Sequence, residues 1–190
     1  MTTHEKILKS AFEVFSIKGY AGGTTKEIAL NAKVSEVTLF RHFGSKEALF
    51  KEMLEYFCFT PHLKKLLPEI IQKDIEAALL GVAVTFLKTL KEKKHLIKIL
   101  LSESGRYPES IRDVHLKIVN QMNDLLIDFI KSKKYSLRTD KLSEIPNFFW
   151  GMIFAYFVGE EIMFSNDIDI KDAEEVFKTK IDIFLNGIKK

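Results

Sequence analysis

Ten side chains between residues 25 and 46 carry groups that could contact a nucleic acid. Hydroxyl, ammonium, guanidinium and imidazole groups donate hydrogen bonds to phosphate oxygens, whereas carboxylate and apolar side chains contact base edges. Each residue could instead be an ordinary solvated surface residue. Whether it can contact a nucleic acid depends on the helix that presents it. The ten candidates are Thr25, Lys26, Ser35, Glu36, Val37, Thr38, Phe40, Arg41, His42 and Lys46.

The main alternative to a nucleic-acid-binding protein is an enzyme, and the sequence disfavours catalysis. His4-Glu5 lacks the second histidine of a zinc-protease helix, no glycine-rich phosphate loop with its lysine is present, and Cys58 has no evident base partner. The five histidines, at positions 4, 42, 62, 95 and 115, lack metal-ligand spacing. We therefore expect no catalytic residue, no metal and no cofactor.

The candidates fall at the starts, or on one face, of two short predicted helices. Apolar residues recur every three or four positions over 5–17, which predicts an amphipathic helix that Gly19 ends. Thr24 and Glu27 have the spacing of a capping box, with the Thr24 hydroxyl reaching forward and Glu27 reaching back. A second helix should therefore begin there and extend to about residue 32.

A third predicted helix follows after a tight turn. Ser35 can cap a helix over 36–43, Gly44 ends it, and Ser45 caps a fourth helix that Thr60-Pro61 bends or ends. Two short helices joined by a tight turn behind a supporting helix are the elements of a helix-turn-helix, whose second helix enters the major groove. Three helices that only pack together would give the same pattern.

Residue identities over 7–57 favour the helix-turn-helix. This stretch resembles, without gaps, the DNA-binding head of the tetracycline-repressor (TetR/AcrR) family. The resemblance covers roughly the first third of the chain. The matching residues are Ala11, Phe15, Gly19, Tyr20, Thr24, Ile28, Ala29, Val34, Ser35, Thr38, Leu39, His42, Phe43, Lys46, Leu49 and Phe50.

The resemblance implies a role for most of the candidates. The residues implied to bind phosphates are Thr25, Thr38, His42 and Lys46, with Lys46 helped by the positive end of its helix. Those best placed to reach base edges or the adjacent backbone are Lys26, Glu36, Val37 and Arg41. The scaffold residues Ile28, Ala29, Val34, Leu39 and Phe43 should pack the two helices against Phe12 and Phe15.

Three positions depart from the usual pattern of that family. Lys33 stands where the turn commonly has glycine, and Val37 stands where a small residue is frequent. A non-glycine residue in the turn can be accommodated at modest cost, so the fold should survive. Phe40 stands where tyrosine is commonest, and because it lacks the hydroxyl we expect one phosphate contact to be missing.

The remainder of the chain has helical periodicity. Helices are predicted over 69–90, 94–102, 109–132, 141–164 and 171–188, so the fold class is all-α: a three-helix head on a larger helical body. We place the DNA-binding domain at 1–50 and a ligand-binding and dimerisation domain at 51–190.

The apolar run 148–158 is too short for a membrane span. A lone Cys58 and the lack of a secretory start favour the cytoplasm.

Small residues four apart in the body suggest a close helix–helix seam. Gly151, Ala155 and Gly159 line one stripe, and an apolar stripe on the last predicted helix includes Ile181, Phe184 and Leu185. In the resembling family the last two long helices pair with their copies in a four-helix bundle, which implies a homodimer. Packing within the monomer's own core would explain the same residues.

The body is also rich in aromatic residues, with 16 Phe, 5 Tyr and 1 Trp in the whole chain. A pocket for a small hydrophobic or aromatic ligand would use Tyr107, His115, Asn123, Trp150, Phe154 and Phe157. Ordinary core packing is the alternative for each of them.

These observations lead to one expected function and one further alternative. We expect a homodimeric, ligand-responsive repressor that binds a palindromic double-stranded DNA operator, repression being the usual mode of the resembling family. The formal net charge is only +3 and no basic block is present, so a helical interaction protein that does not bind DNA is the alternative. The operator sequence, the regulated genes and the ligand's identity do not follow from the sequence.

Overall fold

A computed structural model describes residues 1–133 and 143–189 of the chain, and its long regular elements are all helical. The all-α prediction is therefore confirmed. The helices are α1 Thr3–Gly22, α2 Thr25–Asn31, α3 Glu36–Phe43, α4 Lys46–Phe57, α5 Thr60–Ile70, α6 Ile75–Glu92, α7 Lys94–Glu103, α8 Glu109–Ser132, α9 Glu144–Phe157 and α10 Ile170–Ile188. A 3-10 turn at Ser104–Arg106 precedes α8, and a π-helical turn at Val158–Met163 follows α9.

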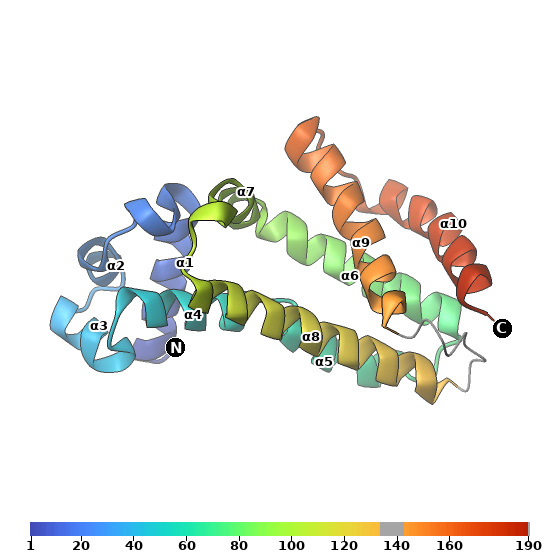
Figure 1. Cartoon of the computed structure of the whole chain (residues 1–190), viewed down its shortest axis with the longest axis horizontal. Coiled ribbons are helices and arrows are strands. Elements are labelled where there is room, and N and C mark those ends of the chain that lie inside the picture. The colour runs from blue at the N-terminus through green and yellow to red at the C-terminus, as the bar shows by residue number, and fades with distance from the viewer. Residues whose placement is uncertain (134–142, 190) are drawn as a thin grey trace. The chain divides into compact units, whose positions relative to one another are not determined.

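The first of two compact units comprises Met1–Cys58 together with His95–Ile118. Within it, α1 packs on α2 and α4, and α3 packs on both of them (blue to cyan in Figure 1). Phe15, Leu39 and Phe50 are buried at its centre, and Leu96 of α7 and Ile111 of α8 join the same core. Two segments that are far apart in the sequence thus share one hydrophobic core.

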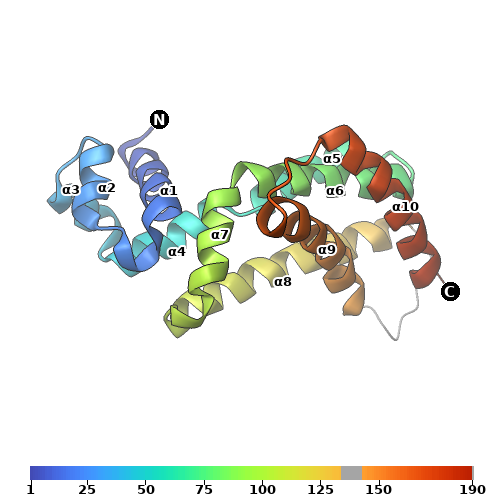
Figure 2. The same ribbon diagram turned by 90° about the horizontal axis from the view of Figure 1, so that it is seen from above.

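The second compact unit comprises Phe59–Lys94 and the described part of Val119–Lys190. Helix α6 is central to it, because α5, α9 and α10 all pack against α6 (Figure 2). Leu79, Val82 and Phe149 are fully buried there. Apolar side chains on several faces of α6 explain why it can be covered on several sides.

The two compact units are defined by which residues pack together, and not by which residues share a function. The predicted domain boundary between residues 50 and 51 separates a DNA-binding part from a ligand-binding part, so the compact units do not test it. It stays a prediction.

One predicted helix is wrong in extent. The expected helix over 69–90 is divided, because α5 ends at Ile70 and α6 begins at Ile75, where Asp74 Oδ1 accepts a hydrogen bond from Ala77 N at 2.9 Å. Pro61 lies in the first turn of α5, where its missing N–H costs no helical hydrogen bond. The proline therefore begins a new helix after α4 has ended.

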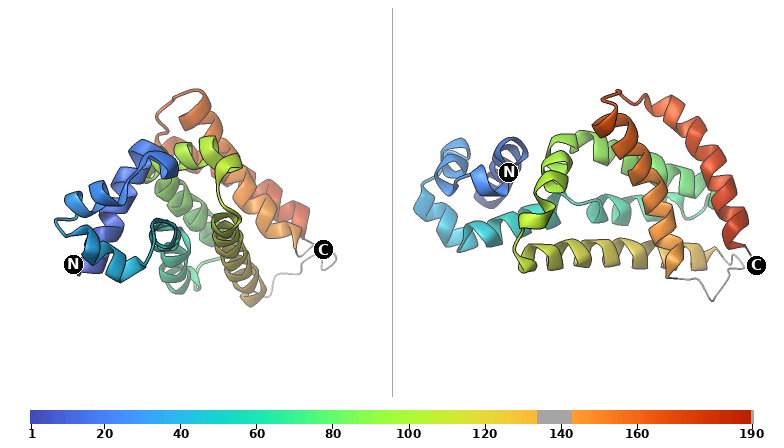
Figure 3. Two further views of the ribbon diagram at one scale, coloured as in Figure 1. Left: turned by 60° about the vertical axis from the view of Figure 1, so that its left-hand side comes forward. Right: turned by 45° about the horizontal axis from the view of Figure 1, so that its top comes forward.

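The predicted helix over 141–164 also differs from the structure. Lys141 lies outside the described residues, and the described helix changes to a π-helical turn after Phe157. In that turn Phe164 N donates to Gly159 O at 3.0 Å, and the chain then continues through a short loop into α10 (Figure 3). A π turn carries one extra residue, which periodicity alone does not reveal.

The π-helical turn holds a buried carboxylate. Glu161 is 3% exposed, accepts a hydrogen bond from Ile168 N at 3.1 Å, and pairs with Lys94 at 2.6 Å and Lys91 at 3.2 Å. Burial by itself raises the pKa of the Glu161 carboxyl, but these hydrogen bonds outweigh burial and leave the pKa below its usual value. Glu161 thereby ties the end of α6 to the loop before α10.

Candidate nucleic-acid interface

Three side-chain caps define the helix-turn-helix. The side-chain oxygens of Thr24, Ser35 and Ser45 each accept a hydrogen bond from the backbone N–H three residues on, at 3.2, 3.1 and 3.0 Å. The predicted helix-turn-helix is confirmed, with caps at the predicted residues. The expected capping box is only half formed, because Glu27 accepts from the Thr24 hydroxyl and the Lys18 ammonium instead of Thr24 N–H.

The turn itself contains a strained backbone position. Lys33 has a left-handed φ of 57°, a conformation in which its Cβ approaches the following carbonyl. This is the position at which the sequence lacks the glycine of the resembling family. The fold accommodates lysine there, as expected from the sequence.

The scaffold residues lie inside, as predicted. Ile28 and Leu39 are fully buried and Phe43 is 7% exposed, while Val34 is half-buried against the same core. Ser10 of α1 is also buried and donates a hydrogen bond to Ile28 O at 2.7 Å. α1 therefore holds α2 through both apolar packing and a buried polar contact.

The ten candidate contact residues all keep some exposure. Thr25, Glu36, Thr38 and Lys46 are half-buried, and the exposed ones are Lys26, Ser35, Val37, Phe40, Arg41 and His42. Val37 is 78% exposed although it is apolar, and Phe40 is 42% exposed. Exposed apolar groups on the second helix of such a motif fit contact with thymine methyls or sugars.

Two hydrogen bonds within the candidate set fix side chains at the start of α3. The Thr25 hydroxyl donates to Glu36 Oε1 at 2.5 Å, which links α2 to α3. The Ser35 and Thr38 hydroxyl oxygens lie 2.8 Å apart, within hydrogen-bond distance. The protein therefore orients these side chains before any nucleic acid binds.

Lys46, at the first position of α4, is held against the end of α1. Its Nζ lies 4.8 Å from the centroid of the Tyr20 ring and donates to Ala21 O at 3.4 Å. Burial lowers the pKa of the Lys46 ammonium, partly opposed by the charge of Glu103. A phosphate at the start of α4 would meet both the positive end of the helix and the Lys46 ammonium group.

His42 lies next to His4, whose sequence context showed only an incomplete zinc-protease motif. The His4 ring stacks on Phe43 with centroids 4.7 Å apart, and its Nε2 is 2.8 Å from Glu52 Oε1. The centroid of the His42 ring is 5.9 Å from that of His4. His4 thus supports the end of α3 from the first turn of α1.

Comparison with known proteins shows which family the chain resembles. Residues 7–53 match the family model described as bacterial regulatory proteins, tetR family. The uncharacterized HTH-type transcriptional regulator YvkB of Bacillus subtilis is 29% identical over 188 residues, covering 98% of this chain and 97% of its own. The chain belongs to the TetR family of transcriptional regulators.

Two further relatives of this TetR-family regulator extend the comparison. The icaADBC negative regulator IcaR of Staphylococcus epidermidis is 25% identical over 126 residues, covering 66% of this chain and 68% of its own. A solved putative TetR-family regulator from Mesorhizobium loti has a TM-score of 0.79 at 20% identity, covering 99% of this chain and 97% of its own. The chain is a DNA-binding transcriptional regulator and not an enzyme.

The compact unit that contains the head of this TetR-family regulator includes a contact residue that the sequence does not reveal. Glu103 of α7 accepts hydrogen bonds from Tyr20 N at 3.0 Å and from the Tyr107 hydroxyl at 3.4 Å. Gly19 lies so close that a Cβ there would be 2.2 Å from the Glu103 carboxylate. No local pattern signals this contact, because the residues that it joins lie 83 positions apart.

Two hydrogen bonds from α8 reinforce α4 in the same unit. The Ser110 hydroxyl donates to Glu47 Oε1 at 2.5 Å, and Lys117 pairs with Glu55 at 2.7 Å. Segment His95–Ile118 therefore packs along the head, although it lies far beyond residue 50 in the sequence.

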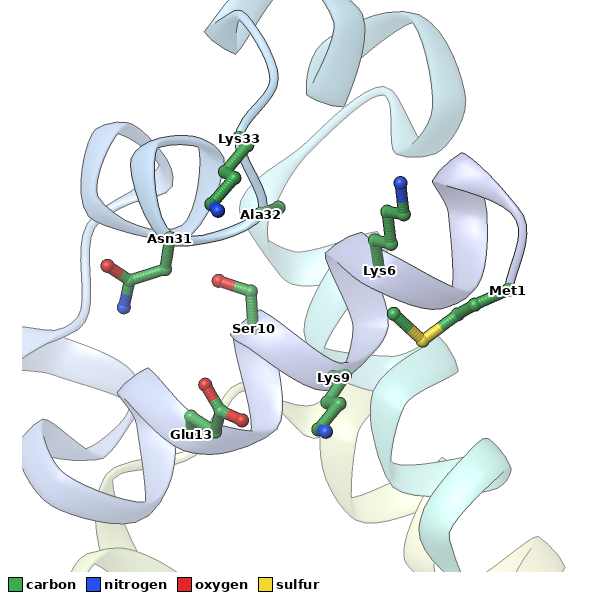
Figure 4. Close-up of a pocket in the computed structure, with 8 residues that line it drawn as sticks. All are labelled: Met1, Lys6, Lys9, Ser10, Glu13, Asn31, Ala32 and Lys33. Carbon is green, nitrogen blue, oxygen red and sulfur yellow. The ribbon is translucent and has the colours of Figure 1, made fainter.

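A surface hollow of about 360 Å³ lies between α1 and the turn after α2 (Figure 4). Its lining residues are Met1, Lys6, Lys9, Ser10, Glu13, Asn31, Ala32 and Lys33. Figure 4 shows the ammonium groups of Lys6 and Lys9 pointing in different directions, so they do not converge on one anion. None of the predicted pocket residues lines this hollow.

The six residues predicted to line a ligand pocket divide between the two compact units. Tyr107 and His115 lie in the unit of the head, and the other four lie in the second unit. Tyr107 packs on Phe50 with ring centroids 5.9 Å apart, and burial raises the pKa of its hydroxyl. His115 is exposed. For Tyr107, packing within the head core is the role that the structure describes.

The remaining four predicted pocket residues differ in burial. Trp150 is 8% exposed and Phe157 is fully buried, whereas Asn123 and Phe154 are half-buried. Asn123 Nδ2 donates to Asn147 Oδ1 at 3.2 Å. Their use by a ligand stays a prediction.

The residues predicted for the dimer interface also fall into two groups. Gly151 and Ala155 are exposed and Gly159 is half-exposed, so their stripe is open surface in the single chain. Ile181, Phe184 and Leu185 are instead 0%, 2% and 6% exposed. The burial of these three fits packing within the core of their own chain, the alternative that the sequence leaves open. Their use in a dimer interface stays a prediction.

The length and apolarity of the helices also indicate whether any of them could span a membrane. Within residues 1–133 and 143–189, no helix combines the length and apolarity that crossing a bilayer requires.

Proposed function

We propose that this TetR-family regulator acts as a homodimeric repressor of a palindromic operator and that a small hydrophobic or aromatic ligand releases it. The observation that carries the proposal is the head, in which buried scaffold residues hold an exposed contact face on α3. One short recognition helix covers few bases, so useful specificity requires two heads and two half-sites. Binding to a bacterial operator would place the protein in the cytoplasm.

Exposed apolar and small residues on α9 and α10 support the dimer. Phe148 and Ile183 are each 63% exposed, and a Cβ added at Gly151 or Gly159 would meet nothing within 4 Å. Open small residues allow another helix backbone to approach closely, and exposed large apolar residues favour burial by a partner. A second copy that presents the same surface satisfies both conditions.

Sedimentation analysis of a matched pair of variants tests the dimer. Ala155→Arg places a bulky charge on the exposed stripe and should convert dimers to monomers, with loss of operator binding. Asn120→Arg makes the same change at an exposed site on α8 and should leave the dimer intact. A monomeric wild-type protein at micromolar concentration would refute the dimer.

Repression is proposed from the relatives. The Staphylococcus epidermidis relative is named a negative transcriptional regulator. A reporter gene placed behind the operator should be silenced by the wild-type chain and expressed with Arg41→Ala, which removes an exposed cation from α3. Activation of the reporter by the wild-type chain would reverse the sign of the proposal.

Polar atoms without partners support a ligand site in the second compact unit. Trp150 Nε1 and Thr60 Oγ1 are buried and have no hydrogen-bond partner among the described residues. The Trp150 ring lies against aromatic neighbours, with centroids 5.1 Å from Phe86 and 5.9 Å from Phe59. A buried donor left unpaired costs about 1–3 kcal/mol, which a ligand carrying an acceptor would recover.

The single tryptophan makes the ligand proposal measurable. Planar aromatic compounds that carry an acceptor should quench Trp150 fluorescence and release DNA over the same concentration range. Trp150→Phe removes the N–H and should raise the concentration needed for release. Compounds that quench Trp150 while DNA stays bound would separate that site from regulation and contradict the proposal.

A further inference from the structure

The recognition helix begins with an acidic residue on a surface that has to meet a polyanion. Glu36 is the first residue of α3 and is half-buried. Within the described part of the chain, no ion pair joins Glu36 to a cation. The positive end of α3 stabilises this charge in the free protein, but a phosphate placed there would be repelled.

Thr25 orients this carboxylate. Its hydroxyl donates to Glu36 Oε1 at 2.5 Å, across the interface of α2 and α3. Since that proton is used, the Thr25 hydroxyl has none left to donate to a phosphate while the bond persists. Glu36 Oε2 receives no hydrogen bond from any described residue, so one acceptor remains at the start of α3.

The major groove offers few groups that a carboxylate can accept from. Guanine presents two acceptors and thymine an acceptor and a methyl, whereas cytosine and adenine present exocyclic amines. The adenine amine lies beside the N7 acceptor, which repels a carboxylate. The cytosine amine has no acceptor beside it on its own base.

We propose that Glu36 accepts a hydrogen bond from the exocyclic amine of a cytosine in each half-site and that Thr25 is the positioning residue that holds it there. The inference rests on the proposed operator binding and names the chemistry that one side chain recognises. It also replaces the phosphate contact implied for Thr25 by an indirect role.

The test uses the full-length protein and sites enriched from random double-stranded DNA. Each half-site position is changed to all four bases, and affinities are measured at one salt concentration for wild type, Glu36→Gln, Thr25→Val and Thr25→Ser. Wild type should favour cytosine at one position by about tenfold per half-site. Glu36→Gln should transfer the preference at that position to adenine, because an amide both donates and accepts.

The threonine variants separate positioning from simple phosphate binding. Thr25→Val should reduce the cytosine preference several-fold, and Thr25→Ser, which keeps the hydroxyl, should restore it. An equal loss of affinity for all four bases in Thr25→Val would make Thr25 a phosphate contact and overturn its positioning role.

The remaining outcomes also decide. If folded Glu36→Gln keeps the base preferences of wild type, Glu36 only links α2 to α3 and the inference fails while operator binding stands. If the wild-type protein enriches no sequence, the proposed function itself fails, which is a distinct result.

Discussion

At the scale of single residues, the head combines oriented contact groups with a strained turn. Thr25 holds Glu36, Ser35 lies within hydrogen-bond distance of Thr38, and Lys46 lies over Tyr20 before any DNA is present. Side chains fixed in advance lose less rotamer entropy on binding than free ones. The turn before α3 is strained, because Lys33 occupies a left-handed conformation.

Replacing Lys33 by glycine should stabilise the head. A left-handed φ costs an L-residue about 1–2 kcal/mol, and the greater unfolded-state entropy of glycine offsets about half of that. We expect Lys33→Gly to raise the free energy of unfolding by about 0.5–1 kcal/mol in urea titrations. Lys33→Ala, which keeps the Cβ, should give no gain; equal gains from both variants would exclude backbone strain as the cause.

Removing the Lys46 ammonium should weaken binding to every DNA sequence to a similar degree. Each neutralised phosphate releases counterions, so Lys46→Ala should reduce the slope of log affinity against log salt by about one per head, which is about two for a dimer. Binding titrations at several salt concentrations measure the slope. Lys88→Ala removes an exposed lysine from α6 and serves as the control. An unchanged slope for Lys46→Ala would count against a phosphate contact.

At the scale of elements, the end of α1 depends on α7. Gly19 has φ 71° and ψ 177°, a region that only glycine occupies readily, and it lies against the Glu103 carboxylate. Glycine is therefore required there both by backbone conformation and by the space available.

Gly19→Ala should accordingly destabilise the head. The strained backbone and the displaced Glu103 side chain should together cost about 2–3 kcal/mol in urea unfolding. Gly22→Ala is the matched control, because a Cβ there would meet its nearest neighbour at an ordinary 3.5 Å. A variant Gly19→Ala as stable as wild type would mean that α1 and α7 do not need this close approach.

The buried Glu161 should make the second unit sensitive to acid. Its pKa is lowered in the folded state, so the stability that it contributes is present above the unfolded pKa, near 4.3, and is lost as the pH falls through the folded pKa. Glu161→Gln should cost about 2 kcal/mol near neutral pH, and this difference should shrink progressively in unfolding curves below about pH 4.

An exposed ion pair provides the comparison for Glu161. Glu175 pairs with Lys178 at 2.5 Å on the surface of α10, where its side chain is 72% exposed. Glu175→Gln should change stability by less than about 0.5 kcal/mol at any pH. A Glu161→Gln effect that did not vary with pH would show that the ionised carboxylate is not what stabilises the π-helical turn.

At the scale of the whole molecule, local signals predicted the head well and long-range contacts escaped prediction. The caps at Thr24, Ser35 and Ser45 involve residues three positions apart, so their sequence pattern predicts them directly. Asp74 caps α6 inside a run of helical periodicity, and the periodicity alone does not show the break between α5 and α6. Contacts such as Tyr20 with Glu103 form only in the folded chain.

The packing of His95–Ile118 with Met1–Cys58 also bears on regulation. A ligand can change DNA affinity only if it binds two arrangements of the protein differently. Because Glu103 contacts the end of α1 and its charge acts on Lys46, a shift of α7 would change the surroundings of a candidate phosphate contact. The segment 95–118 is therefore where we expect ligand-dependent differences in amide hydrogen exchange.

The most direct test of the account is the selection of bound sequences from random double-stranded DNA by the full-length protein. A two-fold dimer that uses the α2–α3 head should enrich an inverted repeat, with half-sites spaced to suit recognition helices in successive major grooves. Enrichment of no sequence, or of a single asymmetric site, would contradict a dimeric helix-turn-helix regulator.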